Sequence, residues 1–258
     1  MYHQMTMERP PDKHERKAAP HKEVFDLFGP LRTILDSLRN DIEAGNYAVV
    51  IGDDASGRIP TLAVERFLRA RYGALGYPPP KTRFVAGSGS GSESISGADA
   101  ERKSAALNEF VGGLNVPEGK RALIVTDVVL TGGSLSPLVA ALEAHGIAFD
   151  IATIGFDEKL GELALGWFEA SGGRIISGGP DLYPNIFKRH DLAGVVKEKT
   201  ELHARRYRDS EEIMGWHKWF ARRRAQRTIN EVRDDVADLA DALEAAYEVP
   251  KHDVGSPE

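Results

Sequence analysis

Residues 121–134 read Arg-Ala-Leu-Ile-Val-Thr-Asp-Val-Val-Leu-Thr-Gly-Gly-Ser. The stretch opens with a continuous apolar run, which is typical of a strand buried on both faces of a parallel sheet. It passes Asp127 and reaches a turn with two glycines, and a helix is predicted directly behind it, from Pro137 to His145. A strand that leads through a glycine-rich turn into a helix is a building unit of an open parallel α/β sheet.

The same alternation of strands and helices continues on both sides of this stretch. Upstream, the apolar patterns predict strands at residues 47–51 and 82–85 and helices at residues 30–44, 60–72 and 100–111. Downstream, a further strand is predicted at residues 149–154. We therefore expect a Rossmann-like α/β domain with a parallel sheet and right-handed crossovers over about residues 23–180.

The two ends of the chain differ from this domain. Residues 1–22 are polar, rich in Pro, His and Lys, and without apolar periodicity, so a disordered or loosely attached leader is predicted there. Residues 23–208 are assigned to the α/β domain with its variable hood, and residues 209–258 to a long C-terminal helical extension and tail. The tail helix carries an apolar stripe at spacings of four and three, made of Ala225, Ile229, Val232, Val236, Leu239, Leu243 and Ala246.

The stripe has two interpretations. It packs on its own α/β domain, or it packs on a second copy of the chain in a homodimer. Charge supports the dimer, because residues 210–227 hold 5 basic and 2 acidic groups, whereas residues 228–247 hold 1 and 6. Two such helices placed antiparallel would bring opposite charges together.

Composition excludes several classes of protein. Among 258 residues, 41% are hydrophobic and 28% charged, as in globular proteins. The chain has no cysteine, so it has no disulfide, no thiolate zinc site and no cysteine nucleophile. No apolar run is long enough to span a membrane and no secretory signal is recognisable, so we expect a cytoplasmic location without a membrane partner.

Charge distribution argues against a uniformly basic nucleic-acid binder. The net charge is −6, although residues 188–227 hold 12 basic and 6 acidic groups. Arginines and aromatic residues cluster within residues 205–227, which leaves an RNA contact open beside the commoner interpretation as a solvated or subunit-contacting helix face.

The turn at residues 131–134 has the properties of a phosphate site. Gly132 and Gly133 allow backbone N–H groups to approach an anion, while Thr131 and Ser134 add hydroxyl donors near a helix N-terminus. Asp127, at the end of the strand, would accept hydrogen bonds from a sugar diol. The alternative is an ordinary strand-turn-helix junction.

A second strand ends in a comparable loop. Residues 52–58 read Gly-Asp-Asp-Ala-Ser-Gly-Arg and precede a predicted helix. Arg58, Ser56 and the loop amides would supply donors to a pyrophosphate. Taken alone, the loop also fits an acidic helix cap followed by a solvent-facing arginine.

Together, these two stretches resemble the type I phosphoribosyltransferases, which use 5-phosphoribosyl 1-pyrophosphate in nucleotide metabolism. Residues 126–134 match the family's motif of two acids, about three apolar residues and Thr-Gly-Gly-Thr/Ser, except that Thr126 replaces the first acid. Residues 53–58 resemble the family's pyrophosphate loop. The likeness covers about residues 30–160 and implies the family's parallel α/β fold.

The resemblance implies roles for individual residues. The 5-phosphate would be bound by Thr131, Gly132, Gly133 and Ser134, and the ribose by Thr126 and Asp127. The pyrophosphate would be bound by Asp54, Ala55, Ser56, Gly57 and Arg58. Mg²⁺ is the implied cofactor, with Asp53 and Asp127 as its ligands, directly or through water.

The resemblance also places a mobile lid in the Gly/Ser tract at residues 86–97, which is otherwise a surface loop or a linker. Arg102 and Lys103 are candidate catalytic residues beside Arg58 and Asp127, or a solvated helix start. The implied reaction is Mg²⁺-dependent phosphoribosyl transfer to an unidentified base or related acceptor. Because Thr126 replaces an acid, a protein that binds the donor or a nucleotide without turnover is the alternative.

Overall fold

The structure is a computed structural model, and it describes residues 21–53, 57–85, 97–157, 166, 168–180, 197–198, 205–206 and 217–248. Nearly all of the predicted leader, residues 1–20, lies outside this part of the chain. The same holds for residues 86–96 of the predicted lid and residues 181–196 of the predicted hood.

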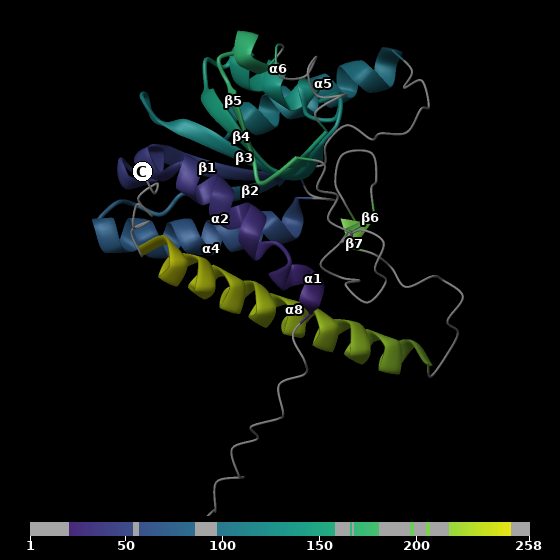
Figure 1. The fold of residues 1–258 in the computed structure, drawn as a ribbon. Coiled ribbons are helices and arrows are strands. Elements are labelled where there is room, and N and C mark those ends of the chain that lie inside the picture. The colour runs from purple at the N-terminus through teal and green to yellow at the C-terminus, as the bar shows by residue number, and fades with distance from the viewer. Residues whose placement is uncertain are drawn as a thin grey trace, which may run out of the picture.

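Five strands form one parallel sheet (Figure 1). They are β1 (Tyr47–Asp53), β2 (Lys81–Val85), β3 (Arg121–Val129), β4 (Ala148–Phe156) and β5 (Arg174–Ser177). Their order across the sheet is β2-β1-β3-β4-β5, and every neighbouring pair is parallel. This arrangement confirms the predicted α/β class. The two-residue strands β6 (Lys197–Glu198) and β7 (Arg205–Arg206) pair antiparallel.

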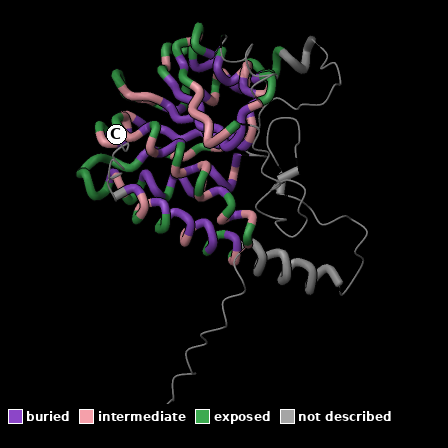
Figure 2. The backbone as a smooth tube through the Cα atoms, viewed as in Figure 1, coloured by how far each residue is buried: buried purple, intermediate pink, exposed green. Residues whose placement is uncertain are grey.

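The helices lie on both faces of the sheet (Figure 1). On one face lie α1 (Lys22–Phe25), α2 (Phe28–Ser37), α3 (Arg39–Glu43) and α4 (Arg58–Leu75), and α8 (His217–Glu248) packs on the outer side of α2 and α4. The opposite face is covered by α5 (Gly97–Gly112) and α6 (Ser136–Ala144). Because both faces are covered, the central strands β1, β3 and β4 are buried almost throughout (Figure 2). This burial explains their continuous apolar sequence.

Alternate residues of the central strands enter two separate cores. On the α2/α4 side, Val50, Leu123 and Ile154 pack with the helices. On the α5/α6 side, Ile51, Ile124 and Ile151 do the same. The strand period of two thus distributes each apolar run between both layers.

The C-terminal helix α8 belongs to the first of these cores. Its residues Val232, Val236, Leu239, Leu243 and Tyr247 are buried among side chains of α2 and α4. Arg39 of α3 lies over the Tyr247 ring, with 3.7 Å from Cζ to the ring centroid, and donates a hydrogen bond to the Tyr247 carbonyl oxygen. The His21 main-chain N–H also donates to Asp235 Oδ2, over 2.9 Å.

The packing of α8 decides between the two interpretations of the stripe. From Val232 onward the stripe packs on its own domain, as the first alternative predicts, so a homodimer that buries the same residues is wrong. The oligomeric state itself stays a prediction. No helix within the described ranges combines the length and apolar character needed to cross a membrane.

Candidate functional site

The strand order places one reversal of direction in the sheet, between β1 and β3. From β1 the chain moves outward to β2 on one side and then returns to β3 on the other. In open parallel sheets, ligands bind outside the carboxyl ends of the strands at such a reversal. The fold therefore selects the ends of β1 and β3 as the candidate site.

Three polar residues lie where β1 ends and its pairing with β3 stops. Strand β3 itself continues past Thr126 and Asp127 to Val129, so Asp127 is not the last residue of its strand, as had been predicted. Gly52 of β1 pairs with Val125 of β3, so Asp53 and Thr126 are the next residues along each strand. Asp53, Thr126 and Asp127 are only 6%, 2% and 8% exposed. We call Asp53, Gly57, Arg58, Thr126, Asp127 and the loop 130–135 the switch-point site.

Gly57 brings the loop after β1 into direct contact with β3. A Cβ atom at this position would lie 2.4 Å from the Val125 carbonyl oxygen and 3.0 Å from Thr126 Cα, so no larger residue fits without a shift. The Gly57 N–H donates to the Asp53 carbonyl oxygen over 2.7 Å, and the Thr61 hydroxyl donates to the Gly57 carbonyl oxygen over 2.5 Å. The two stretches that carry the family resemblance thus meet at one point.

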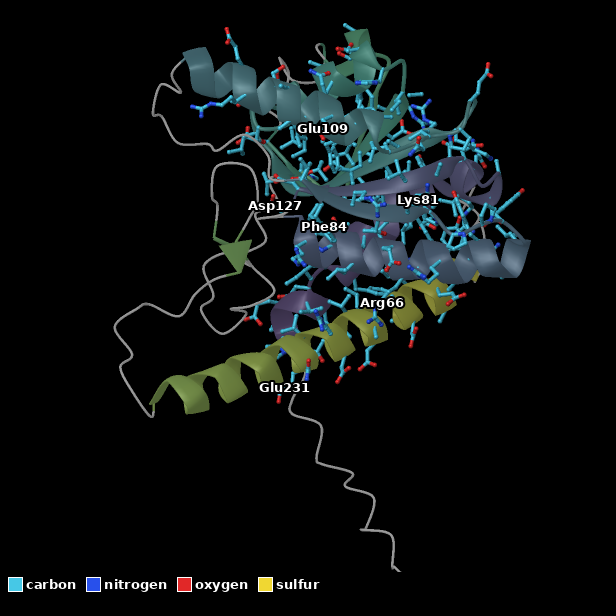
Figure 3. All side chains as sticks on the ribbon, turned by 180° about the vertical axis from the view of Figure 1, so that it is seen from behind. Arg66, Lys81, Phe84, Glu109, Asp127 and Glu231 are labelled. Atoms are coloured by element: carbon cyan, nitrogen blue, oxygen red, sulfur yellow. The ribbon has the colours of Figure 1, made fainter. Side chains whose placement is uncertain are left out.

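Arg58 is the first residue of α4 and stacks on an aromatic ring. Its Cζ lies 4.6 Å from the centroid of the Phe84 ring, near the end of β2. Gly52 makes room for this ring, because a Cβ there would lie 2.7 Å from it. Figure 3 shows Phe84 and Asp127 at the same end of the sheet. Cation–π stacking of this kind restricts where the guanidinium lies.

Two buried threonines lie beside Asp127 at paired positions of β3 and β4, and of these two it is Thr126 whose hydroxyl contacts the carboxylate. The Thr126 hydroxyl lies 3.3 Å from Asp127 Oδ1. The Thr153 hydroxyl donates to the Gly155 carbonyl oxygen over 2.7 Å and lies 3.4 Å from the Asp127 carbonyl oxygen. Thr126 and Thr153 are partners in the β3–β4 register.

The predicted phosphate turn, residues 131–134, follows the carboxyl end of β3. Gly132 has a φ of +73°, a conformation that favours glycine, and its carbonyl oxygen accepts hydrogen bonds from the N–H groups of Leu135 and Ser136. Helix α6 begins at Ser136, one residue before the predicted start. Because the amides of Leu135 and Ser136 serve the turn itself, main-chain donors to an anion would have to come from residues 131–134.

Gly133 lies in open surroundings. The nearest atom to a Cβ at this position is Thr131 Oγ1, at the ordinary contact distance of 3.6 Å. The protein's own packing therefore leaves room for a side chain at Gly133.

Of the remaining predicted site residues, several lie outside the described part of the chain and one is exposed on a helix. Asp54, Ala55, Ser56 and the Lys103 side chain lie outside the described residues. Arg102 is exposed on α5. Among the described side chains, no group of three or more His, Cys, Asp or Glu residues is arranged to hold a metal ion.

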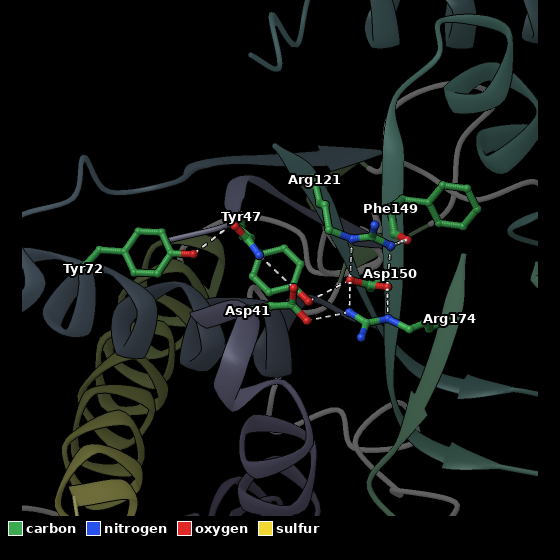
Figure 4. Close-up of polar contacts among 8 residues, drawn as sticks. Asp41, Tyr47, Tyr72, Arg121, Phe149, Asp150 and Arg174 are labelled. Atoms are coloured by element: carbon green, nitrogen blue, oxygen red, sulfur yellow. Dashed lines mark hydrogen bonds and ion pairs between the residues drawn. The ribbon is translucent and has the colours of Figure 1, made fainter. Parts of the chain in front are cut away.

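The sequence did not predict a second buried polar cluster, which lies at the amino ends of the strands (Figure 4). The fully buried Asp150 carboxylate accepts two hydrogen bonds each from Arg121 and Arg174 and one from the Tyr47 hydroxyl. All four residues lie at or near the start of a strand. Asp150 is on β4, Arg121 on β3, Arg174 on β5 and Tyr47 on β1. The sequence signal was an Arg or Asp just inside an otherwise apolar strand.

Charge and burial shift several pKa values in this cluster. Burial alone would raise the pKa of Asp150, but hydrogen bonds from Arg174, Arg121 and Tyr47 outweigh it and hold that pKa below its ordinary value of 3.8. Burial, followed by the nearby Asp150 charge, raises the pKa of the Tyr47 hydroxyl. All these groups are satisfied by one another, so the cluster is a structural tie across four strands.

Comparison with known proteins finds a likeness among solved structures. No family model matches the chain, and no curated protein is similar to it in sequence. Among solved structures, the chain is similar to orotate phosphoribosyltransferase from Aeropyrum pernix, with 19% identity and a TM-score of 0.33. The likeness covers 62% of this chain and 70% of that chain. At this identity and TM-score it assigns neither a family nor an activity to the protein.

Proposed function

We propose that the protein is a phosphoribosyltransferase-like enzyme that works at the switch-point site. It would transfer a phosphoribosyl group between 5-phosphoribosyl 1-pyrophosphate and a nitrogenous base or related acceptor. The observation that carries this proposal is the contact of Gly57 with the main chain of Val125 and Thr126. Through that contact, a loop suited to pyrophosphate meets β3, the strand that leads into a turn suited to phosphate, at the point of strand reversal.

The donor's 5-phosphate would be bound by the turn 131–134. This assignment is supported by the place of the turn, which joins β3 to α6 and has Gly132 in a conformation that favours glycine. The Asp127 carboxylate would accept hydrogen bonds from the ribose hydroxyls. These contacts hold the sugar from parts of the donor that do not react, which supplies remote binding energy for the transfer.

The pyrophosphate would lie toward the loop after β1. Arg58, held over Phe84, would donate to its oxygens. The buried carboxylates of Asp53 and Asp127 fit Mg²⁺, which in proteins is often bound by one or two carboxylates together with substrate phosphates. When bound, Mg²⁺ would neutralise charge on the pyrophosphate.

The transfer exchanges one bond at the anomeric carbon for another. A nitrogen of the acceptor forms a bond to C1 of the ribose, while the bond from C1 to the pyrophosphate oxygen breaks and its electron pair leaves with the pyrophosphate. The proton of the acceptor nitrogen passes to solvent. Arg58 stabilises the negative charge that develops on the leaving oxygen, and Asp127 keeps the ribose oriented.

Release of pyrophosphate tests this proposal directly. The full chain is incubated with the donor and Mg²⁺ against a panel of purines, pyrimidines and nicotinate-like acids, with Asp127→Asn as the matched control. We expect one acceptor class to release pyrophosphate with the unaltered chain and much less with the variant. Equal release from both proteins would remove the switch-point site from the reaction.

A second function is favoured by one observation. Thr126 stands where the family motif has an acid, and its side chain is buried beside Asp127. A protein that binds the donor or a nucleotide without turnover would retain the binding contacts and lose the acid. Tight binding of the donor in calorimetry, without pyrophosphate release for any acceptor, would establish this alternative.

A further inference from the structure

The hydroxyl of Thr126 contacts the side chain that would bind the ribose. Thr126 Oγ1 lies 3.3 Å from Asp127 Oδ1, and both residues are buried. An ionised carboxylate only accepts hydrogen bonds, so the threonine hydroxyl is the donor. At 3.3 Å this contact is longer than the usual O–H···O hydrogen bond, so it orients the carboxylate more than it stabilises it.

Thr126 is itself held from both sides. The tight approach of Gly57 fixes its Cα on one side, and the register of β3 with β4 pairs it with Thr153 on the other. The main chain on which its hydroxyl is mounted therefore cannot move without displacing the loop after β1 or strand β4. A donor in such a position holds its acceptor in one orientation.

We infer that Thr126 is a positioning residue, which fixes the Asp127 carboxylate for the ribose; this inference rests on the proposed function. Donation to Oδ1 sets the rotation of the carboxylate about its Cβ–Cγ bond and so the direction of Oδ2. An acid at this position would add a second negative charge beside Asp127 instead of a donor. With Thr126 in place of the motif's first acid, the site therefore has one carboxylate here, that of Asp127, and the neutral Thr126 hydroxyl orients it.

Donor binding distinguishes this role from a purely structural one. Calorimetry with 5-phosphoribosyl 1-pyrophosphate and Mg²⁺ compares the unaltered chain with Thr126→Val, Thr126→Ser and Thr153→Val. Thr153→Val is the matched control, because it removes a buried hydroxyl at the partner position that contacts Asp127 only through the main chain.

We expect Thr126→Val to weaken binding about tenfold, since the carboxylate loses its fixed orientation. Thr126→Ser should restore most of the affinity. Thr153→Val should lower the melting temperature but bind as the unaltered chain does. Equal affinities in Thr126→Val and the unaltered chain, or equal losses in both valine variants, would overturn the inference. If Thr126→Val does not fold, Thr126→Ala takes its place in the same comparison.

A double-mutant cycle and crystal structures separate this inference from the proposed function. In an Asp127→Ala background, Thr126→Val should cost no further affinity, whereas an additional loss would show that Thr126 acts elsewhere. If the unaltered chain binds no donor, the proposed function is wrong. Crystal structures without ligand then decide the positioning role: a carboxylate that rotates in Thr126→Val supports it, and one that stays in place refutes it.

Discussion

Gly57 packs against the main chain of Thr126 so closely that a Cβ atom would lie 3.0 Å from the Thr126 Cα. The contact joins the end of β1 to the end of β3 without any side chain of residue 57. Arg58 follows immediately as the first residue of α4, so this contact also sets where its guanidinium starts.

Gly57→Ala should therefore displace the loop after β1. The added methyl group would lie 2.4 Å from the Val125 carbonyl oxygen, and overpacking of this kind costs about 1–3 kcal/mol of unfolding free energy. Donor binding should fall as well, because Arg58 moves. Chemical denaturation and calorimetry measure the two effects.

Gly73→Ala is the matched control for this change. It lies on the same helix, α4, with nothing within 4 Å of the added methyl group, so it should be neutral or stabilise the protein by about 0.5–1 kcal/mol. Similar behaviour of the two variants would contradict the tight contact at Gly57.

Gly133→Val should abolish donor binding and leave the fold intact. The nearest atom to a Cβ at this position is 3.6 Å away, so the branch point of the side chain meets no clash, whereas an anion at the main chain of the turn would be displaced. Calorimetry on protein with an unchanged melting temperature measures the effect. Full affinity in this variant would place the phosphate elsewhere.

Asp127→Asn should weaken donor binding or turnover by about 1.5–3 kcal/mol, the contribution of hydrogen bonds to a charged group. The change keeps the size of the side chain and an oxygen that accepts from Thr126. Kinetics per folded molecule, read beside the melting temperature, test it. A lower melting temperature with unchanged kinetics would make Asp127 a structural residue.

Stability should depend on pH through Asp150. Its pKa is lowered in the folded state, so its contribution is present above the ordinary carboxyl range and is lost as pH falls below about 4. Asp150→Asn should cost about 1.5–3 kcal/mol at pH 7, because it removes the charge that accepts from Arg121 and Arg174, whose own side chains are partly exposed to solvent.

Denaturation between pH 3 and pH 7 measures both effects. The unaltered chain should lose stability on acidification, and the difference between it and Asp150→Asn should shrink toward pH 3. A constant difference across this range would mean that the Asp150 charge does not contribute.

Leu239→Ala should cost about 2–5 kcal/mol, because Leu239 is fully buried against the α/β domain. Ala242→Ser, on the exposed side of the same helix, should change the stability little. A protein truncated near Arg208 would lack the stripe and should not stay folded. If it stays folded in sedimentation and circular dichroism, the packing of α8 is not required.

The strands and their class could be predicted from the sequence because each central strand is a continuous apolar run. The predicted first and last residues of the helices are less accurate. Helix α4 was predicted to begin at Pro60, but it begins at Arg58, since proline is tolerated within the first turn, where its missing N–H has no helical partner. The helix continues past Tyr72 to Leu75 and ends at Gly76, whose φ is +78°.

The order of the strands and the partner of α8 could not be read from periodicity. An apolar stripe such as Val232 to Leu243 records that one face is buried and not which surface covers it. The polar cluster around Asp150 could not be predicted either, because its residues come from four strands that only the tertiary fold brings together. In the site, Thr126 and Asp127 are recognisable from the motif, whereas the contact of Gly57 with Thr126 and the pairing of Thr126 with Thr153 depend on the tertiary fold.

The core that α8 completes also contains Val24 of α1, so its members are drawn from both ends of the described chain. During synthesis on a ribosome, α2 and α4 emerge long before Tyr247, and their apolar faces stay uncovered until then. Contacts at such sequence separation also form slowly. The interval between translation of α4 and release of α8 is therefore when the nascent protein is most exposed to aggregation and to proteases.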